Sequence, residues 1–187
     1  MPPPVRAAAL VVVWILWFLP FFLQKRRTPK VAGARIDRRA RFGVLLQVFG
    51  FFIAFTHGPK AWAMAIPMWR AMAGACFATA AVALAWTAVG HLGRQWRVDA
   101  GLNPDHKLVR TGAYRFVRHP IYSSMLWLFS TGVAWIGTLP GWPVALALVI
   151  AGIEVRVRVE DGLLRSRFGG AFIAWQRQTS AYLPFIR

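Results

Sequence analysis

Histidine and tyrosine side chains that could take part in chemistry gather in residues 105–122 of this 187-residue chain. The segment contains His106, His119 and Tyr122 among several basic residues. Pro120 suits the first turn of a helix, where its missing N–H costs nothing. The N-terminus of that helix would present free N–H groups and a partial positive charge, which favour binding of a carboxylate or a phosphate. The sequence therefore predicts a polar site where a helix begins near residue 120.

A second group of candidate residues lies near the end of a long apolar stretch, at residues 154–161. Side chains four positions apart on a helix are neighbours. This spacing predicts three charge pairs: Glu154–Arg158, Arg156–Glu160 and Asp161–Arg165. Charges within a membrane span cost about 2.5–3.5 kcal/mol each and commonly mark functional sites. Arginines that anchor a helix end would explain the bases, but not the acids beside anionic lipids. We expect Arg156 and Glu160 to line a site.

The composition restricts the class of protein. The chain is 57% hydrophobic with a mean hydropathy of +0.46, yet 23 Lys and Arg against 6 Asp and Glu give a net charge of +17. Apolar and charged residues must therefore be separated along the chain, and the high apolar content excludes disorder. A basic nucleic-acid-binding domain does not need such long charge-free stretches, and we expect no nucleic acid as a partner. Cys76 is the only cysteine, so we expect no internal disulfide and no cysteine metal site.

Five segments are apolar enough to cross a membrane as helices of about 20 residues, which predicts an all-α integral membrane protein. Pro-Gly-Trp-Pro at residues 140–143 separates the last two. The predicted spans are residues 7–24, 42–59, 71–93, 120–139 and 142–161. The third is rich in Gly and Ala, which favours close helix packing. We divide the chain into N-terminal transmembrane helices, residues 1–85, and a C-terminal part, residues 86–187.

Basic residues predict the orientation of these spans, because they concentrate on the cytoplasmic side of membrane proteins. Residues 25–41, 94–118 and 156–187 hold eight, six and six Lys and Arg. The opposite side holds three: Arg6, Lys60 and Arg70. We therefore place the N-terminus outside and the C-terminus in the cytoplasm. Residues 32–34 resemble a signal-peptide cleavage site, but the basic block follows the first apolar run, so we expect that helix to be retained.

Three motifs stand in order in the second half of the chain. They are Gly-Ala-Tyr-Arg-Phe-Val-Arg-His-Pro-Ile-Tyr at residues 112–122, Arg156-x-x-x-Glu160-Asp161-x-x-Leu164-x-x-x-Phe168-Gly169, and Leu-Pro-Phe-Ile at residues 183–186. His-x-Leu-Val at residues 106–109 precedes them. Over residues 86–187 the sequence closely resembles the isoprenylcysteine carboxyl methyltransferase family. Its members are integral-membrane enzymes that use S-adenosylmethionine, and they are related to phospholipid N-methyltransferases.

The resemblance implies a helical cofactor pocket on the cytoplasmic side, built by the C-terminal half. It also implies carboxyl O-methylation of an isoprenylcysteine-like or other lipophilic acceptor, which enters from the membrane lipids. Positioning is the main requirement of such a transfer, and an arginine can hold a carboxylate while leaving a lone pair for reaction. Arg156 would face the acceptor, and we assign Arg118, Arg156 and Glu160 to catalysis. The residues implied for cofactor binding are His106, Lys107, Leu108, Val109, Tyr114, His119, Pro120, Ile121, Tyr122 and Glu160.

The sequence departs from the family pattern at a few positions. Asp161 stands where the family usually has a second Glu, and Phe172 and Trp175 stand where it has Tyr. The Gln that the family carries before the His-x-Leu-Val segment has no clear counterpart here, and Gln95 is a candidate for it. These aromatic positions are therefore not expected to use a hydroxyl group.

Other functions remain open from the sequence. A phospholipid amine or a small thiol could be the methyl acceptor, although the charge of Arg156 would repel a cationic amine. A non-catalytic membrane protein that keeps the fold is a further alternative, but it would gain nothing from costly paired charges. A reductase with a related helical core would bind a nicotinamide cofactor, and no additional basic subsite for one is evident.

Overall fold

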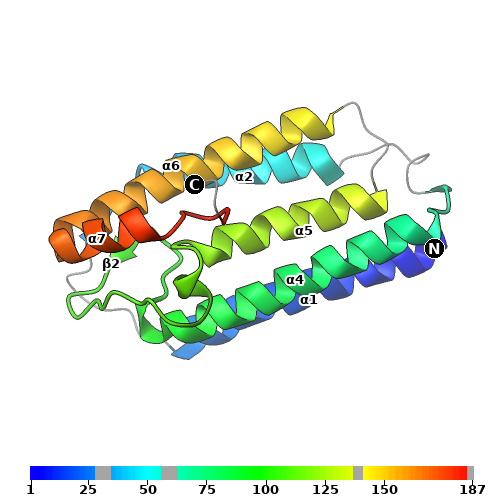
Figure 1. Cartoon of the computed structure of the whole chain (residues 1–187). Coiled ribbons are helices and arrows are strands. Elements are labelled where there is room, and N and C mark those ends of the chain that lie inside the picture. The colour runs from blue at the N-terminus through cyan, green and yellow to red at the C-terminus, as the bar shows by residue number, and fades with distance from the viewer. Residues whose placement is uncertain (28–34, 56–62, 137–140, 185–187) are drawn as a thin grey trace.

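The computed structural model describes residues 1–27, 35–55, 63–136 and 141–184. Long helices dominate it: α1 (Pro3–Arg27), α2 (Ala40–Phe55), α4 (Met68–Leu92), α5 (Pro120–Ile136) and α6 (Trp142–Phe168), followed by the short α7 (Gly170–Gln178) (Figure 1). Two 3₁₀ turns, η1 (Gly93–Gln95) and η2 (Gly112–Arg115), lie between α4 and α5. Strands β1 (Arg35–Ile36) and β2 (Gly101–Leu102) form one short antiparallel pair.

The long helices associate as two groups that lie side by side (Figure 1). In one, α2 packs along α6; in the other, α4 packs along α5 and α1 lies against α4. Glycines allow the α2–α6 contact, because a Cβ on Gly43 would lie 2.6 Å from the carbonyl oxygen of Gly152. Gly74 of α4 lies against the Trp135 ring of α5, whose Nε1 donates to the Ala71 carbonyl at 3.0 Å. The close packing expected for the Gly/Ala-rich third span is confirmed.

Each predicted span coincides in position with a helix over the described residues. α1 and α4 are long and apolar enough to cross a membrane by length and composition, and α2 is a shorter apolar helix. α5 begins at Pro120, as predicted, and α6 begins at Trp142 with Pro143 in its first turn. The predicted ends of the second and fourth spans, residues 56–59 and 137–139, lie outside the described residues, as do 185–186 of the last motif.

Two differences concern the boundaries. α6 continues past the predicted end at residue 161 to Phe168, since the charged residues there keep helical spacing until Gly169 adopts a φ of +52°. The division expected at residue 85 falls inside α4, so the two parts of the chain share one helix.

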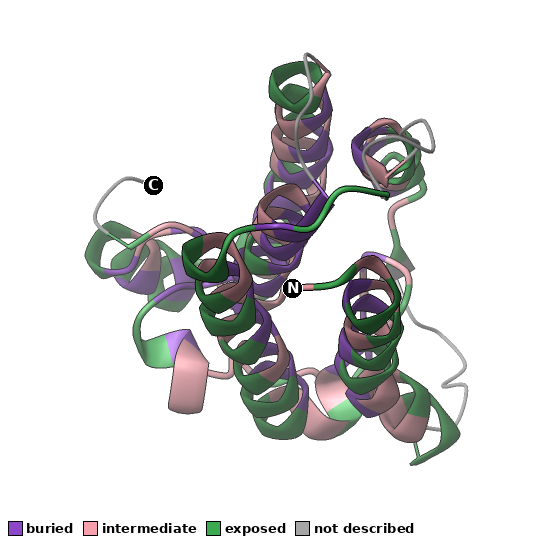
Figure 2. Ribbon diagram, turned by 90° about the vertical axis from the view of Figure 1, so that its right-hand side faces the viewer, coloured by how far each residue is buried: buried purple, intermediate pink, exposed green. Residues whose placement is uncertain are grey.

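Exposed residues lie along the outward faces of the long helices (Figure 2), and many of them carry large apolar side chains. On α1 and α2 these include Val11, Ile15, Phe42, Leu45 and Phe52, each more than half exposed. Apolar patches of this extent are unusual on the surface of a soluble monomer and typical of a surface that contacts lipid. Both the helix lengths and this surface therefore favour an integral membrane protein.

Candidate active site

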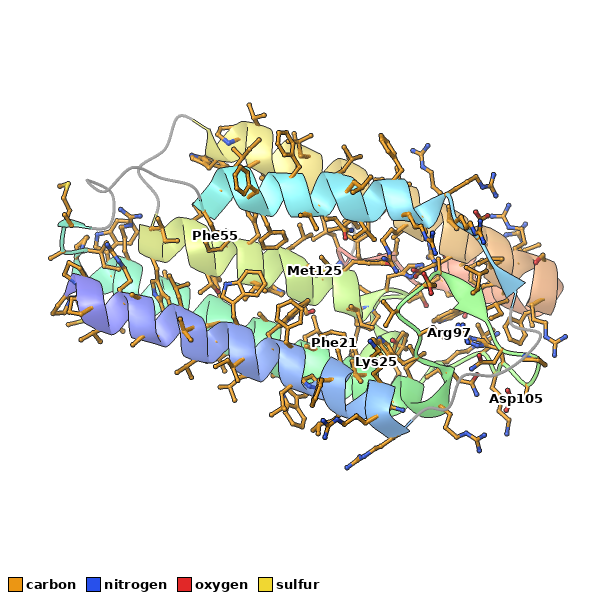
Figure 3. All side chains as sticks on the ribbon, turned by 180° about the vertical axis from the view of Figure 1, so that it is seen from behind. Phe21, Lys25, Phe55, Arg97, Asp105 and Met125 are labelled. Atoms are coloured by element: carbon orange, nitrogen blue, oxygen red, sulfur yellow. The ribbon has the colours of Figure 1, made fainter. Side chains whose placement is uncertain are left out.

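A cavity of about 560 Å³ lies between the two helix groups at the end of the bundle where α7 and β2 are found. Phe21 and Lys25 of α1 and Met125 of α5 border it, and Arg97 lies in the loop at that end (Figure 3). α2, α6 and residues 95–102 complete its wall. Its size falls within the range of small-molecule sites.

The structure brings the predicted site residues together around this cavity. Every one of them borders it except Pro120, which starts α5 and is fully buried. The residues that meet there are Arg118, Arg156 and Glu160, together with His106, Lys107, Leu108, Val109, Tyr114, His119, Ile121 and Tyr122. They come from the loop before α5, from the start of α5 and from the second half of α6.

Tyr122 lies between Arg156 and Glu160 and connects α5 to α6. Its hydroxyl donates to Glu160 Oε1 at 2.5 Å and accepts a hydrogen bond from Arg156 Nε at 2.7 Å. Arg156 Nη2 donates to Glu160 Oε1 and to the Val98 carbonyl, both at 3.3 Å. The predicted Arg156–Glu160 pair is therefore confirmed. Among the described residues nothing accepts a hydrogen bond from Arg156 Nη1, which leaves one corner of the guanidinium for a ligand.

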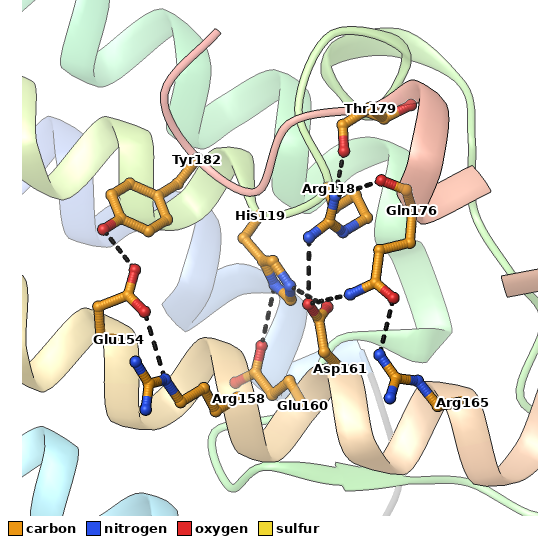
Figure 4. Close-up of polar contacts among 10 residues, drawn as sticks. All are labelled: Arg118, His119, Glu154, Arg158, Glu160, Asp161, Arg165, Gln176, Thr179 and Tyr182. Atoms are coloured by element: carbon orange, nitrogen blue, oxygen red, sulfur yellow. Dashed lines mark hydrogen bonds and ion pairs between the residues drawn. The ribbon is translucent and has the colours of Figure 1, made fainter. Parts of the chain in front are cut away.

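His119 lies in front of two adjacent carboxylates (Figure 4). Its Nε2 is 2.8 Å from Asp161 Oδ1, and its Nδ1 is 3.3 Å from Glu160 Oε2. Burial lowers the pKa of His119, but hydrogen bonds to Asp161 and Glu160 and their negative charges outweigh it and raise the pKa to about 9. At neutral pH the ring is therefore an imidazolium that donates from both nitrogens.

Asp161 is held from three sides. Besides His119, it accepts hydrogen bonds at 3.1 Å from Arg118 Nη2 and from Gln176 Nε2 of α7 (Figure 4). The predicted Asp161–Arg165 pair is wrong, since Asp161 bonds to these partners while Arg165 donates to Gln176 Oε1 at 2.8 Å. The Glu154–Arg158 pair forms at 3.5 Å as predicted. We refer to Arg118, His119, Glu160, Asp161 and Gln176 as the carboxylate clamp.

Residues 179–182 accept hydrogen bonds from residues at the start of α5. The N–H groups of Arg118 and His119 and the hydroxyl of Ser123 donate to carbonyl oxygens at 2.8, 2.7 and 2.5 Å. The acceptors are, in that order, Ser180, Ala181 and Tyr182. The Arg118 guanidinium also donates to the Thr179 carbonyl. Sequence reasoning missed this segment, although Tyr182 and Glu154, whose side chains meet at 2.7 Å, are both polar groups within apolar surroundings.

This arrangement corrects one expectation about the helix N-terminus. The N–H groups of Tyr122 and Ser123 donate to the His119 carbonyl, and that of His119 itself is bound to Ala181. Pro120 has no N–H group. The start of α5 therefore offers far fewer free donors for an anion than predicted, and positive charge at this point comes mainly from the side chains of Arg118 and His119.

A different set of polar atoms that border the cavity is buried without a hydrogen bond to any described residue. The atoms are Gln47 Nε2, Gln95 Oε1, Arg97 Nε and His106 Nδ1. We refer to Gln47, Gln95, Arg97 and His106 as the unpaired set. Buried polar atoms are normally hydrogen-bonded, so four that border one cavity favour a ligand that completes their hydrogen bonds.

The environments of His106 and Tyr114 keep both side chains neutral. Burial lowers the pKa of His106 to about 4, with the charges of Arg167 and Arg97 acting in the same direction and that of Asp105 opposing them. Burial raises the pKa of Tyr114 above its ordinary value, with the charge of Glu160 adding to the effect. Neither side chain therefore brings a charge to the cavity near pH 7.

Several cavity residues were not predicted from the sequence. The α1 residues Trp17, Phe18, Phe21 and Phe22 face the cavity, as do Gln47 of α2 and Trp96. The spacing of the four α1 residues is that of one helix face and could have signalled a shared surface. Phe172 and Trp175 pack with Tyr114, and Trp175 borders the cavity.

The fold and the cavity together define a helical-bundle protein with membrane-type apolar helices and a polar-lined ligand cavity at one end. Residues 73–166, from α4 to the charged part of α6, match the Isoprenylcysteine carboxyl methyltransferase (ICMT) family. The chain belongs to this family.

Individual relatives agree with the family. Protein-S-isoprenylcysteine O-methyltransferase of Tribolium castaneum is 28% identical over 123 residues, which cover 63% of this chain and 43% of the relative. Protein-S-isoprenylcysteine O-methyltransferase B of Arabidopsis thaliana is 30% identical over 82 residues, 43% of this chain and 41% of the relative. A protein of Oryza sativa subsp. indica named as a probable protein-S-isoprenylcysteine O-methyltransferase is 36% identical over 83 residues, 43% and 42% of the two chains. The matched regions span about two fifths of each relative.

Proposed function

We propose that this protein is an S-adenosylmethionine-dependent membrane methyltransferase that transfers a methyl group to the carboxylate of an isoprenylcysteine-like or other lipophilic acceptor. The contact of Arg156, Tyr122 and Glu160 at the cavity wall carries this proposal. In this contact the guanidinium of Arg156 is partly free to bind a carboxylate, in a cavity lined by both polar and apolar side chains.

The residues present fit S-adenosylmethionine. Leu108, Val109 and Trp96 provide apolar surface for an adenine ring, and unpaired atoms of His106 and Gln95 belong to side chains that border the same cavity. Glu160 places a carboxylate at the cavity, which suits a cationic ligand. When bound, the cofactor supplies an electrophilic methyl group on a positively charged sulfur.

The other requirement of the reaction is to bind and orient the methyl acceptor. Arg156 Nη1 would bind one carboxylate oxygen and leave the other with a free lone pair. Glu160 and Tyr122 would fix the guanidinium on its other edge, so that the acceptor is oriented without reorganisation. The aromatic residues of α1 would receive the lipophilic part of the acceptor and exclude water.

We also propose that all five long helices cross the membrane, with the N-terminus outside and the cavity open to the cytoplasmic side. The basic residues of the described loops and of α7 lie at the cavity end of the bundle, which supports this orientation. Labelling of Arg115→Cys and Arg177→Cys in a Cys76→Ala background, with a membrane-impermeant reagent, should occur only after the cytoplasmic side is opened. Labelling from outside would overturn the orientation.

The central experiment measures cofactor binding and methyl transfer by the purified protein in detergent. Wild type should bind S-adenosylmethionine and transfer its labelled methyl group to an S-farnesylated cysteine acceptor, whereas Glu160→Ala and His119→Ala should lose binding. Arg158→Ala, at a 75% exposed side chain, is the matched control and should behave as wild type. Folded wild-type protein that binds no S-adenosylmethionine would overturn the proposal.

A further inference from the structure

Gln47 is a buried amide in the middle of helix α2, and every α2 residue after Arg41 other than Gln47 is apolar. It is 4% exposed, and it borders the cavity. Its Nε2 has no hydrogen-bond partner, and no hydrogen bond of its Oε1 is present among the described residues. The proposed methyl transfer as derived from Arg156, Tyr122 and Glu160 makes no use of this side chain.

The helix contact places Gln47 one turn from Arg156. α2 and α6 run in opposite directions and meet at Gly43 and Gly152. A Cβ on Gly152 would lie 2.8 Å from Gln47 Cγ, and one on Gly43 would lie 2.8 Å from Arg156 Cγ. Since Gln47 follows Gly43 by four residues, it lies about 6 Å beyond Arg156 along the helix pair, towards the middle of the bundle.

A buried amide without partners lowers stability, because it loses hydrogen bonds to water and gains none in the protein. An apolar side chain of similar volume would satisfy the packing against Gly152 without this penalty. The polar side chain is therefore best explained by a ligand that completes its hydrogen bonds. That ligand must reach from Arg156 into the apolar part of the cavity, as the tail of a lipophilic acceptor does.

We infer that Gln47 is a specificity-determining residue that selects acceptors with an amide bond between the carboxylate and the lipophilic chain, as in an N-acyl amino acid. This rests on the proposed function. An amide side chain carries both a donor and an acceptor, so Nε2 can donate to the acceptor's carbonyl while Oε1 accepts from its N–H. A plain hydrocarbon at this point leaves both groups unpaired.

The geometry suits such a molecule. In an N-acyl amino acid the amide nitrogen is attached to the carbon that bears the carboxylate, so the amide lies within one helical turn of a carboxylate held by Arg156. The acyl chain then continues past Trp17 and Phe21 of α1. The transfer itself is unchanged: a carboxylate oxygen forms the new O–CH₃ bond, and the electrons of the broken C–S bond return to sulfur, which leaves as a neutral thioether.

The test compares N-palmitoylglycine with a saturated fatty acid of equal chain length as methyl acceptors. Wild type should show a kcat/KM about tenfold higher for N-palmitoylglycine, corresponding to the loss of a paired amide with the fatty acid. Gln47→Leu should remove this preference while leaving the Kd for S-adenosylmethionine unchanged. Gln178→Leu makes the same chemical change at an exposed position outside the cavity and should keep the preference. If Gln47→Leu does not fold, the unbranched Gln47→Met serves in its place.

Two outcomes separate this inference from the proposed function. Wild type that methylates an S-farnesylated cysteine but shows no preference within the matched pair overturns the role of Gln47 alone. So does a preference that persists in Gln47→Leu. Wild type that methylates no lipophilic carboxylate at all overturns the proposed function.

Discussion

The carboxylate clamp and the unpaired set border the same cavity but differ in how their polar atoms are satisfied. In the clamp, each carboxylate accepts hydrogen bonds from more than one side chain, and Arg118 Nε is the one clamp side-chain atom that is buried without a partner. In the unpaired set, each side chain keeps a buried polar atom without a bond. The carboxylate clamp therefore stabilises the protein without a ligand, whereas the unpaired set has polar atoms that a ligand can bind.

This difference separates two roles within one site. Polar networks in which every group is hydrogen-bonded fix side-chain positions. Removing one member leaves a buried charge without its partner in an environment of low dielectric constant. Unpaired groups contribute no stability, but their replacement removes interactions with the ligand. Clamp variants should therefore lose stability, and unpaired-set variants should lose ligand affinity alone. Arg156 combines both properties. Nε and Nη2 of its guanidinium are hydrogen-bonded within the protein, and Nη1 has no acceptor among the described residues.

The largest effect on activity is expected at that connection. Arg156→Ala should lower kcat/KM for a carboxylate acceptor about a hundredfold, since charge-assisted hydrogen bonds to the acceptor are lost. S-adenosylmethionine binding, measured by calorimetry, should change little. Arg158→Ala is the control, because its side chain is 75% exposed and pairs only with Glu154 among the described residues. Full activity of Arg156→Ala would favour an amine acceptor, such as a phospholipid, over a carboxylate.

The largest effect on stability is expected within the clamp. Asp161→Asn should lower the free energy of unfolding by about 3 kcal/mol, because it leaves the buried charges of Arg118 and His119 with one carboxylate fewer. Thermal unfolding in detergent would measure this loss. Asp105→Asn, at an exposed position, should have no comparable effect. An unchanged unfolding temperature for Asp161→Asn would mean that the clamp does not stabilise the fold.

The clamp also predicts a dependence of stability on pH. The pKa of His119 is raised to about 9 in the folded protein, above its ordinary value near 6.5. Its stabilising contribution is therefore complete below about pH 6.5 and is lost as the pH rises through about 9. The unfolding temperature of wild type should fall between pH 7 and 10, and that of His119→Gln should fall less. Parallel curves for the two proteins would contradict an imidazolium at this position.

The sequence predicted the parts of the site that depend on local spacing. Pro120 marks the start of α5 because proline is tolerated in a first helical turn, and Arg156 meets Glu160 because four residues make one turn. The same spacing predicted a pair of Asp161 and Arg165, and that prediction was wrong. Which side chain pairs with a carboxylate depends on distance and burial as well as on spacing. The buried partners of Asp161, Arg118 and His119, lie more than 40 positions earlier in the chain.

Residues remote in sequence account for most of what was missed. The segment 179–182 reaches His119 only after α5, α6 and α7 have packed, so no local pattern near residue 119 reveals it. Gln47 lies in α2, outside residues 73–166 that match the family, and its position beside Gly152 follows from the α2–α6 contact. The positions of the long helices follow from the apolar segments of the sequence, whereas the side of each helix that faces the cavity does not.

The smallest effect is expected in the unpaired set, where one hydrogen bond to the ligand is removed. His106→Phe keeps a planar ring near Phe168, whose centroid is 6.3 Å away, but removes the unpaired Nδ1. The Kd for S-adenosylmethionine should rise about fivefold, the effect of one hydrogen bond, while the unfolding temperature stays the same or rises. Because the pKa of His106 is lowered to about 4, wild-type binding should show no titration of this ring between pH 5.5 and 7.5. His91→Phe, at an exposed histidine outside the cavity, is the control. A His106→Phe protein that loses stability but keeps its affinity would place His106 with the clamp and remove the distinction between the two groups.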